Sequence, residues 1–377
     1  MQRIIVFYLT FLILFGCNRN YNHEKEKIKS NKHANGFRIE KFENLTKLSV
    51  FNPWEKANNI SFDYYLIPEN TDIPDSLAGK KIIKTPVKRI ICMSTSHLGF
   101  IDALGENKSV VGVSGASYIS NAEIIQNYKA GHVVDVGYGQ NLNYEIIITQ
   151  RPDLVMLYGV DSDVTAAVTK LEELGIPVVI NAEYLETTPL GKAEWIKFVG
   201  AIYSKEAEAE KFFSEIEKSY NSLKELVNKN KVKPNNPKVL VGSPYRDSWW
   251  IPGGNSYLAN LINDACGYYL GKDNLSHESY VISFENALTW GNEADIWINL
   301  GLISSKYEIL ATDQRFVNFG VFKNGRIFNN TNRMSENGGN DFWESGTVFP
   351  NLILRDLISI FHEGTIKEEM VYYREVK

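Results

Sequence analysis

Hydrophobic residues in the stretch 86–188 alternate between short apolar runs and segments with helical spacing. Four runs have the aliphatic, β-branched composition of buried strands: 88–93, 110–113, 154–158 and 177–180. Between them, 97–104 and 161–174 have helical spacing, and each is followed by a glycine, Gly105 or Gly175, which commonly ends a helix. This alternation predicts a parallel sheet with helices on both faces.

The same alternation returns in the stretch 234–377. Two runs predict strands, 238–241 and 295–300, and three segments predict helices, 255–265, 283–290 and 350–361. The Asn324-Gly325 pair within 319–329 predicts a β-hairpin, because this dipeptide favours a tight turn. The chain is therefore expected to contain a second α/β unit of the same kind as the first.

A helical stretch, 189–233, separates the two α/β units. It follows Thr188 and begins with Pro189, an order that favours a helix start. Apolar residues at helical spacing predict one helix over 205–229, which would be about 37 Å long at 1.5 Å per residue. Pro234 cannot continue it. A helix of this length between two units can act as a stiff strut.

The stretch 37–85 has the pattern of strands. Residues 37–42 alternate apolar and polar side chains, and 61–68 is rich in aromatic residues, with a turn signal at Asn52-Pro53-Trp54 between them. We expect a small β-rich N-terminal extension, to which the sequence assigns no function.

The N-terminus has the pattern of a targeting segment. The apolar run 4–15 has roughly a dozen residues, which suits a signal peptide and is short for a transmembrane helix of about 20. Leu14-Phe15-Gly16-Cys17 then resembles the bacterial lipobox, whose cysteine becomes the lipidated N-terminus. We predict a signal peptide at 1–16, lipid on Cys17 and a flexible polar tether at 17–36. The alternative is a buried cysteine after an ordinary signal peptide.

Composition excludes several classes of partner and chemistry. The formal net charge is −5 and no basic stripe stands out, so we expect no nucleic-acid partner. Cys92 and Cys266 lie far apart in the sequence, and we expect buried thiols without chemistry. The sequence shows no Gly-x-Gly-x-x-Gly after its first strand, no P-loop and no Gly-x-Ser-x-Gly elbow. We therefore expect neither an enzyme nor a resident cofactor.

A series of fragments, in order and at matching spacing over about 290 positions, resembles one family. The fragments are 88–94, Leu104-Gly105, 110–113, Val136-Gly137, 141–145, 151–155, 174–179, 250–257, 264–268 and 283–285. Together they resemble the class III, or helical-backbone, periplasmic binding proteins, which serve ABC importers for iron-siderophore complexes, haem and cobalamin. The resemblance implies two Rossmann-like lobes, 86–188 and 234–377, joined by the long inter-lobe helix in 189–233. The family often has a Glu in its first helix, where this chain has Gly99.

The resemblance also implies a function and partners. We expect an extracytoplasmic substrate-binding lipoprotein on the periplasmic side of a bacterial membrane, monomeric and delivering a bulky small molecule to an ABC importer permease. In this family one Glu near the top of each lobe meets arginines of the permease, and the matching residues are Glu145 and Glu285. The alternative is that both are ordinary acids in the first turn of a helix.

The ligand cleft is expected where loops leave the carboxyl ends of the strands. The predicted ligand-binding residues are Ser96, His97, Tyr118, Tyr138, Tyr158, Arg246, Trp249, Trp250, Arg333 and Trp343. Aromatic rings can face a macrocycle or a catecholate, and Arg can pair with a ligand carboxylate. For any single ring, packing in the core is the alternative.

Two other functions stay open at this point. Direct metal-ion binding would need three or four converging His, Asp or Glu ligands, and the histidines of the folded part stand at unrelated spacings. His97 could still ligate the metal centre of a ligand. The other possibility is a lipid-anchored binding or adhesive module with no transport role. The sequence does not distinguish a siderophore from haem or a corrinoid.

Overall fold

The computed structural model describes residues 31–229, 236–244 and 248–377. The predicted signal peptide, Cys17 and Arg246 lie outside the described residues. Within the described part of the chain, no helix combines the length and apolar character that a bilayer-spanning segment needs.

The N-terminal lobe is built on a five-stranded parallel sheet, as the alternating pattern predicted. In sheet order its strands are β7 (Val134–Asp135), β6 (Val110–Val113), β5 (Ile90–Cys92), β8 (Leu154–Leu157) and β9 (Val178–Ile180). Its helices are α1 (Thr95–Ala103), α2 (Ala122–Lys129), α3 (Tyr144–Gln150) and α4 (Val164–Glu173). Ser94 caps α1 by accepting a hydrogen bond from the backbone amide of Ser96. Because β5, β6 and β8 are buried along their whole length, the strands show continuous apolar runs in the sequence.

The C-terminal lobe repeats this architecture. Its sheet order is β12 (Tyr268–Tyr269), β10 (Lys238–Val241), β14 (Ile296–Ile298), β15 (Arg326–Asn329) and β16 (Arg374–Glu375), and only β16 is antiparallel to its neighbour. Its helices are α8 (Tyr257–Asp264), α9 (Phe284–Glu293), α10 (Lys306–Thr312), α11 (Gly320–Asn324) and α12 (Pro350–Phe361). A two-stranded antiparallel ribbon, β11 (Trp249–Ile251) with β13 (Tyr280–Ile282), adds to this lobe.

The hairpin predicted within 319–329 is wrong. The segment forms helix α11 and then strand β15, which pairs in parallel with β14. Asn324 and Gly325 end the helix, and Val321 on α11 is buried in the lobe core. The Asn-Gly pair therefore stops a helix here, and the turn that it makes joins a helix to a strand.

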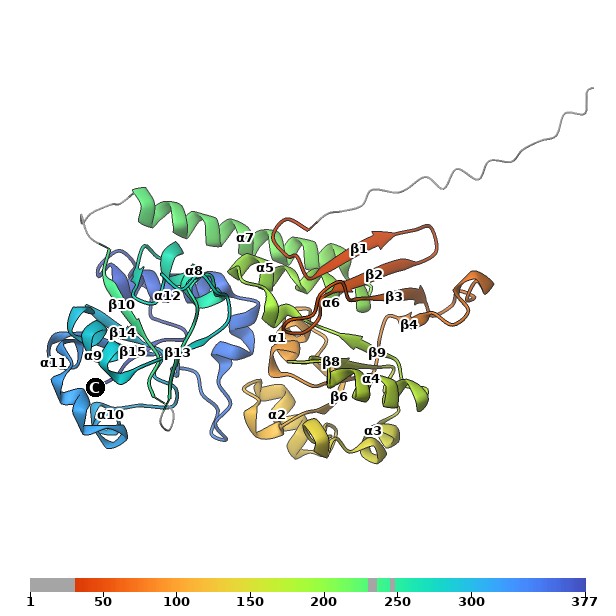
Figure 1. The fold of residues 1–377 in the computed structure, drawn as a ribbon. Coiled ribbons are helices and arrows are strands. Elements are labelled where there is room, and N and C mark those ends of the chain that lie inside the picture. Colours follow the sequence, from red (N-terminus) through yellow and green to blue (C-terminus); the bar gives the residue numbers. More distant parts are fainter. Residues whose placement is uncertain (1–30, 230–235, 245–247) are drawn as a thin grey trace, which may run out of the picture.

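Three consecutive helices join the lobes: α5 (Pro189–Glu194), α6 (Ile196–Ile202) and α7 (Glu206–Lys229). The Thr188 hydroxyl caps α5 by accepting from the backbone amide of Gly191 at 3.1 Å. Helix α7 packs on α6 at one end and on α12 of the C-terminal lobe at the other. Figure 1 shows α7 running along both lobes, as the expected strut would.

The N-terminal extension is a four-stranded sheet in the order β1 (Phe37–Lys41), β2 (Thr46–Phe51), β3 (Ser61–Pro68) and β4 (Lys81–Thr85). It shares a core with the first lobe, because the Phe37 ring packs 4.7 Å from that of Trp195. The Tyr64 hydroxyl also accepts a hydrogen bond from the backbone amide of Ile180 at 3.1 Å. The extension is thus an integral part of the N-terminal lobe.

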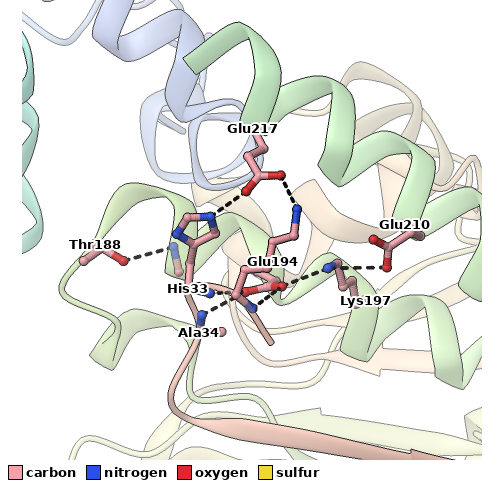
Figure 2. Close-up of polar contacts among 9 residues, drawn as sticks. His33, Ala34, Thr188, Glu194, Lys197, Glu210 and Glu217 are labelled. Atoms are coloured by element: carbon pink, nitrogen blue, oxygen red, sulfur yellow. Dashed lines mark hydrogen bonds and ion pairs between the residues drawn. The ribbon is translucent and has the colours of Figure 1, made fainter. Parts of the chain in front are cut away.

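Residues 31–36 are fastened to the inter-lobe helices, so the prediction of a flexible tether is wrong for this last part of 17–36. The Glu194 carboxylate accepts hydrogen bonds from the backbone amides of Lys32, His33 and Ala34, at 3.1, 2.7 and 2.9 Å. Figure 2 shows this contact, with the His33 ring reaching Glu217 on α7 at 2.8 Å. We call residues 31–36 with their carboxylate partners the N-terminal clamp.

Candidate functional site

A cavity of about 250 Å³ lies at the carboxyl ends of the N-terminal strands. Its lining is Ser94, Thr95, Ser96, Tyr158, Glu183, Tyr184, Lys192 and Trp343. The serines follow β5, Tyr158 follows β8, and Glu183 lies in the turn after β9. Lys192 comes from α5 and Trp343 from the C-terminal half of the chain. The cavity is therefore walled by both halves of the chain, at the edge of the sheet where α/β proteins bind ligands.

A larger recess of about 550 Å³ adjoins this inter-lobe cavity. Tyr158 lines both spaces. Tyr138, Tyr144, Met93 and Leu157 line the larger one with other apolar side chains and with Asp161 and Asp163. Burial, together with the neighbouring Tyr138, raises the pKa of Tyr158 to about 12, so its phenol is neutral at physiological pH. The combined site offers aromatic walls and a volume in the range typical of small-molecule sites, about 300–1,000 Å³.

Glu183 and Lys192 give the inter-lobe cavity its charge. Burial raises the pKa of Glu183, and the nearby Lys192 and a hydrogen bond with Ser96 offset part of that rise. Burial lowers the pKa of Lys192, and Glu183 opposes this shift. The Lys192 ammonium lies 5.1 Å from the centre of the Tyr257 ring, a cation–π contact.

Sequence reasoning missed Glu183, Tyr184 and Lys192. The first two lie in the turn shortly after the predicted strand 177–180, and that position was the signal that could have identified them. Lys192 carries no such signal, because it lies within a short helix whose approach to the cavity depends on how the lobes pack.

The structure brings four of the predicted ligand-binding residues to the site. Ser96, Tyr158 and Trp343 line the inter-lobe cavity, and Tyr138 lines the larger recess. The side chains of Tyr118 and Trp250 are exposed but line neither space. Arg333 is bound to Asp341 at 3.0 Å and also lines neither.

Trp249 and His97 are buried in the lobe cores and, unlike Glu183, line neither space. The Trp249 ring packs parallel to Phe319 in the C-terminal core, and its indole N–H donates to the backbone oxygen of Val241 at 3.2 Å. The His97 ring lies in the N-terminal core with its centroid 6.4 Å from that of Tyr158. Burial lowers the pKa of His97 to about 3, so the imidazole is neutral at physiological pH. Its ring packs edge-to-face against the Tyr158 ring. Among the described residues, no three His, Cys, Asp or Glu side chains form a group suited to hold a metal ion.

A direct contact between the two halves of the chain lies beside the cavity. The Glu344 carboxylate, next to Trp343, accepts a hydrogen bond from the backbone amide of Ser120 at 2.8 Å. Gly99 on α1 sits against this segment, since a Cβ there would lie 2.3 Å from the backbone oxygen of Glu344. The absence of a side chain at Gly99 is therefore required by the close packing of the two halves.

The two predicted docking acids occupy equivalent places on the two lobes. Glu145 is exposed in the first turn of α3, which Asn143 caps, and Glu285 is exposed in the first turn of α9, which Ser283 caps. Neither lines the cavities. Hydrogen bonds from its own backbone amide and from Ser283 lower the pKa of Glu285, with a smaller contribution from Arg315. Both carboxylates are thus placed where a partner could reach them, and the docking role stays a prediction.

A family model described as periplasmic binding protein matches residues 90–333, which covers both lobe sheets as far as β15. The chain belongs to the periplasmic binding protein family. It is 32% identical over 307 residues to an uncharacterized lipoprotein, MJ0878, of Methanocaldococcus jannaschii, covering 78% of this chain and 69% of the relative.

Solved structures of periplasmic binding proteins share the fold. A periplasmic heme binding protein from Pseudomonas aeruginosa aligns with a TM-score of 0.59 at 16% identity, covering 77% of this chain and 98% of that one. A periplasmic vitamin B12 binding protein from Vibrio cholerae aligns with a TM-score of 0.51 at 14% identity, covering 73% and 97%. The resemblance to class III periplasmic binding proteins is confirmed, and with it the two-lobed α/β fold.

Proposed function

We propose that this periplasmic binding protein is a lipid-anchored, extracytoplasmic lipoprotein that delivers a bulky small molecule to the permease of an ABC importer. The ligand would be an iron-siderophore complex, haem or a corrinoid. The observation that carries the proposal is the aromatic recess of about 550 Å³ next to a cavity that both halves of the chain line, with Tyr158 on the wall of both. A largely apolar, ring-lined site of this size, with Asp161 and Asp163 on its wall, suits a large planar or chelated ligand.

Three further features support delivery. The family and its structural neighbours are solute-binding proteins, which bind without turnover. The related MJ0878 is named a lipoprotein, in keeping with lipid on Cys17 of this chain. Exposed acids on both lobes, Glu145 and Glu285, offer charges by which a two-armed permease could be oriented.

The test is a binding titration of the full chain in detergent with haemin, cyanocobalamin and a ferric hydroxamate, followed by quenching of tryptophan fluorescence. We expect one of the three to bind saturably with a stoichiometry of one, and to be recovered chemically unchanged. Tyr158→Ala should weaken that binding at least tenfold, because the ring lines both spaces. Tyr307→Ala is the matched control, since Tyr307 is 81% exposed on α10 and lines neither space. Failure of all three ligands to bind, or conversion of the bound ligand, would contradict the proposal.

A further inference from the structure

One buried carboxyl oxygen in the inter-lobe cavity has no partner within the protein. Glu183 is only 2% exposed and lines the cavity, and its Oε2 atom accepts no hydrogen bond. A buried oxygen without a donor costs about 1–3 kcal/mol, and more when the group is charged. Such an atom is rare in a native structure and calls for a donor from outside the protein chain, which a bound ligand can supply.

Lys192 lines the same cavity and provides the complementary group. Among the described residues, no salt bridge joins the Lys192 ammonium to the Glu183 carboxylate, although each shifts the pKa of the other. The Glu183 carboxylate and the Lys192 ammonium therefore interact electrostatically without direct contact, and both border the same cavity. A ligand group that enters this space meets an acceptor at Glu183 and a donor at Lys192.

Charge balance selects the kind of group that fits. A ligand carboxylate or phosphate would gain from Lys192 but would be repelled by Glu183, and a ligand ammonium would meet the opposite conflict. An uncharged group with its own donor and acceptor satisfies both residues. A primary carboxamide does so, because its N–H donates to Glu183 while its carbonyl accepts from Lys192.

We propose that Glu183 and Lys192 form a subsite for an uncharged donor–acceptor group of the ligand, such as a primary carboxamide. The inference rests on the proposed function and narrows it. A corrinoid carries several carboxamide side chains around its ring, whereas haem carries two carboxylates and no amide. The subsite therefore favours a macrocycle edged with carboxamides.

Two corrinoid probes test the subsite by their charge. Cyanocobalamin presents carboxamides, and cobyrinic acid presents carboxylates at the corresponding ring positions. Cyanocobalamin also carries a nucleotide loop that cobyrinic acid lacks, so the variants below isolate the effect of charge. Wild-type protein should bind cyanocobalamin at least about tenfold more tightly than cobyrinic acid, and more tightly than haemin, since hydrogen bonds to charged groups discriminate on this scale.

Two variants should shift the affinity for cobyrinic acid in opposite directions. Glu183→Gln removes the repulsion and should tighten cobyrinic acid about tenfold, whereas Lys192→Gln leaves Glu183 unbalanced and should weaken it. The matched control is Glu225→Gln, because Glu225 is an exposed acid of α7 paired with Lys229. This variant should change the affinity for neither cobyrinic acid nor cyanocobalamin. Thermal melting of each variant confirms that the chain is folded.

The outcomes separate this inference from the proposed function. If haemin or cobyrinic acid binds wild-type protein as tightly as cyanocobalamin, or if both variants leave the affinity for cobyrinic acid unchanged, the subsite is wrong and the proposed function stands. If haemin, a ferric hydroxamate and both corrinoids all fail to bind wild-type protein, the proposed function fails and the subsite falls with it.

Discussion

Glu344 holds a buried carboxyl at the contact between the two halves of the chain, and its ionisation should govern that contact. Burial raises its pKa from an ordinary 4.5 to about 7, with Asp341 adding to the shift and the backbone amides of Ser120 and Asn121 opposing it. The folded protein thus holds this proton more tightly than the unfolded chain does. Folding is favoured when Glu344 is protonated, and stability is lost as the pH rises from about 4.5 to about 7.

We predict that Glu344→Gln makes the free energy of unfolding less dependent on pH. Since one unit of pKa corresponds to about 1.4 kcal/mol, ionising Glu344 in the folded state costs about 3 kcal/mol above pH 7. The neutral amide avoids this cost, so the variant should be more stable than wild type at pH 8 by about 2–3 kcal/mol and similar to it at pH 5. Urea unfolding at the two pH values measures this. An equal difference from wild type at pH 5 and pH 8 would contradict the assignment.

The residues that the sequence could identify were those fixed by their position after a strand. Ser96 and Tyr158 follow the apolar runs of β5 and β8, so their place at the cavity edge follows from parallel topology. Trp249 comes several residues after β10 and was expected in a loop at the cleft, but it begins strand β11 and its ring packs in the C-terminal core. The orientation of the Trp249 ring and the position of Lys192 at the cavity both depend on how distant elements pack. The residues near them in the sequence therefore do not predict either.

At the scale of elements, the N-terminal clamp ties the chain's beginning to the helices between the lobes. Burial alone would raise the pKa of Glu194. Hydrogen bonds from Lys197 and from the backbone amides of residues 32–34 outweigh this effect and hold the pKa below its ordinary value. Lys197 bonds Glu194 at 2.8 Å, and its ammonium also lies 4.4 Å from the centre of the Phe213 ring on α7. One carboxylate therefore joins three parts of the chain.

We predict that Glu194→Gln lowers the free energy of unfolding by about 2–4 kcal/mol, because Lys197 loses its fully buried partner and keeps only the longer, 3.4 Å ion pair with Glu210. Glu225→Gln is the control, since its salt bridge to Lys229 is exposed and should contribute less than about 1 kcal/mol. Urea unfolding gives both values. Limited proteolysis should also cut the Glu194→Gln variant within residues 31–36 sooner than wild type. Equal losses in the two variants would mean that the clamp does not stabilise the fold.

Most elements were predictable because their patterns are local. The long apolar periodicity gave α7 nearly to the residue, and Thr188 with Pro189 marked the start of α5. The prediction of a hairpin at Asn324-Gly325 was wrong because the sequence pattern of a short helix followed by a short strand resembles that of two strands. Which partner β15 pairs with is set by the parallel sheet as a whole.

At the scale of the whole molecule, we expect α7 to limit how far the lobes can move. It packs on α6 at one end and on α12 at the other, and Glu344 joins the halves again beside the cavity. We predict that ligand binding changes the radius of gyration by less than about 1 Å, because a continuous helix offers no flexible multi-strand hinge. Small-angle scattering with and without ligand measures this. A clear contraction on binding would contradict the role of α7 as a strut.

Glu145 and Glu285 are predicted to serve the permease and not the ligand. The double variant Glu145→Ala, Glu285→Ala should bind ligand as wild type does, since neither acid lines the cavities, while uptake in cells falls at least tenfold. Reversal of both charges to Lys should impair uptake further through repulsion. Glu215→Ala with Glu225→Ala makes the same charge change on α7 and is the control. Loss of ligand binding with normal permease binding would reverse the assignment.

The central claim is that the site between the lobes carries a bulky ligand in life. The most direct measurement is the absorption spectrum of the full chain isolated in detergent from its own host, because siderophore complexes, haem and corrinoids are coloured. We predict a visible band corresponding to one chromophore per chain, which is released when the protein is unfolded. The claim would be contradicted if the isolated protein is colourless and added haemin, cyanocobalamin or ferric hydroxamate produces no spectral change. In that case each mixture would show only the sum of the spectra of free protein and free ligand.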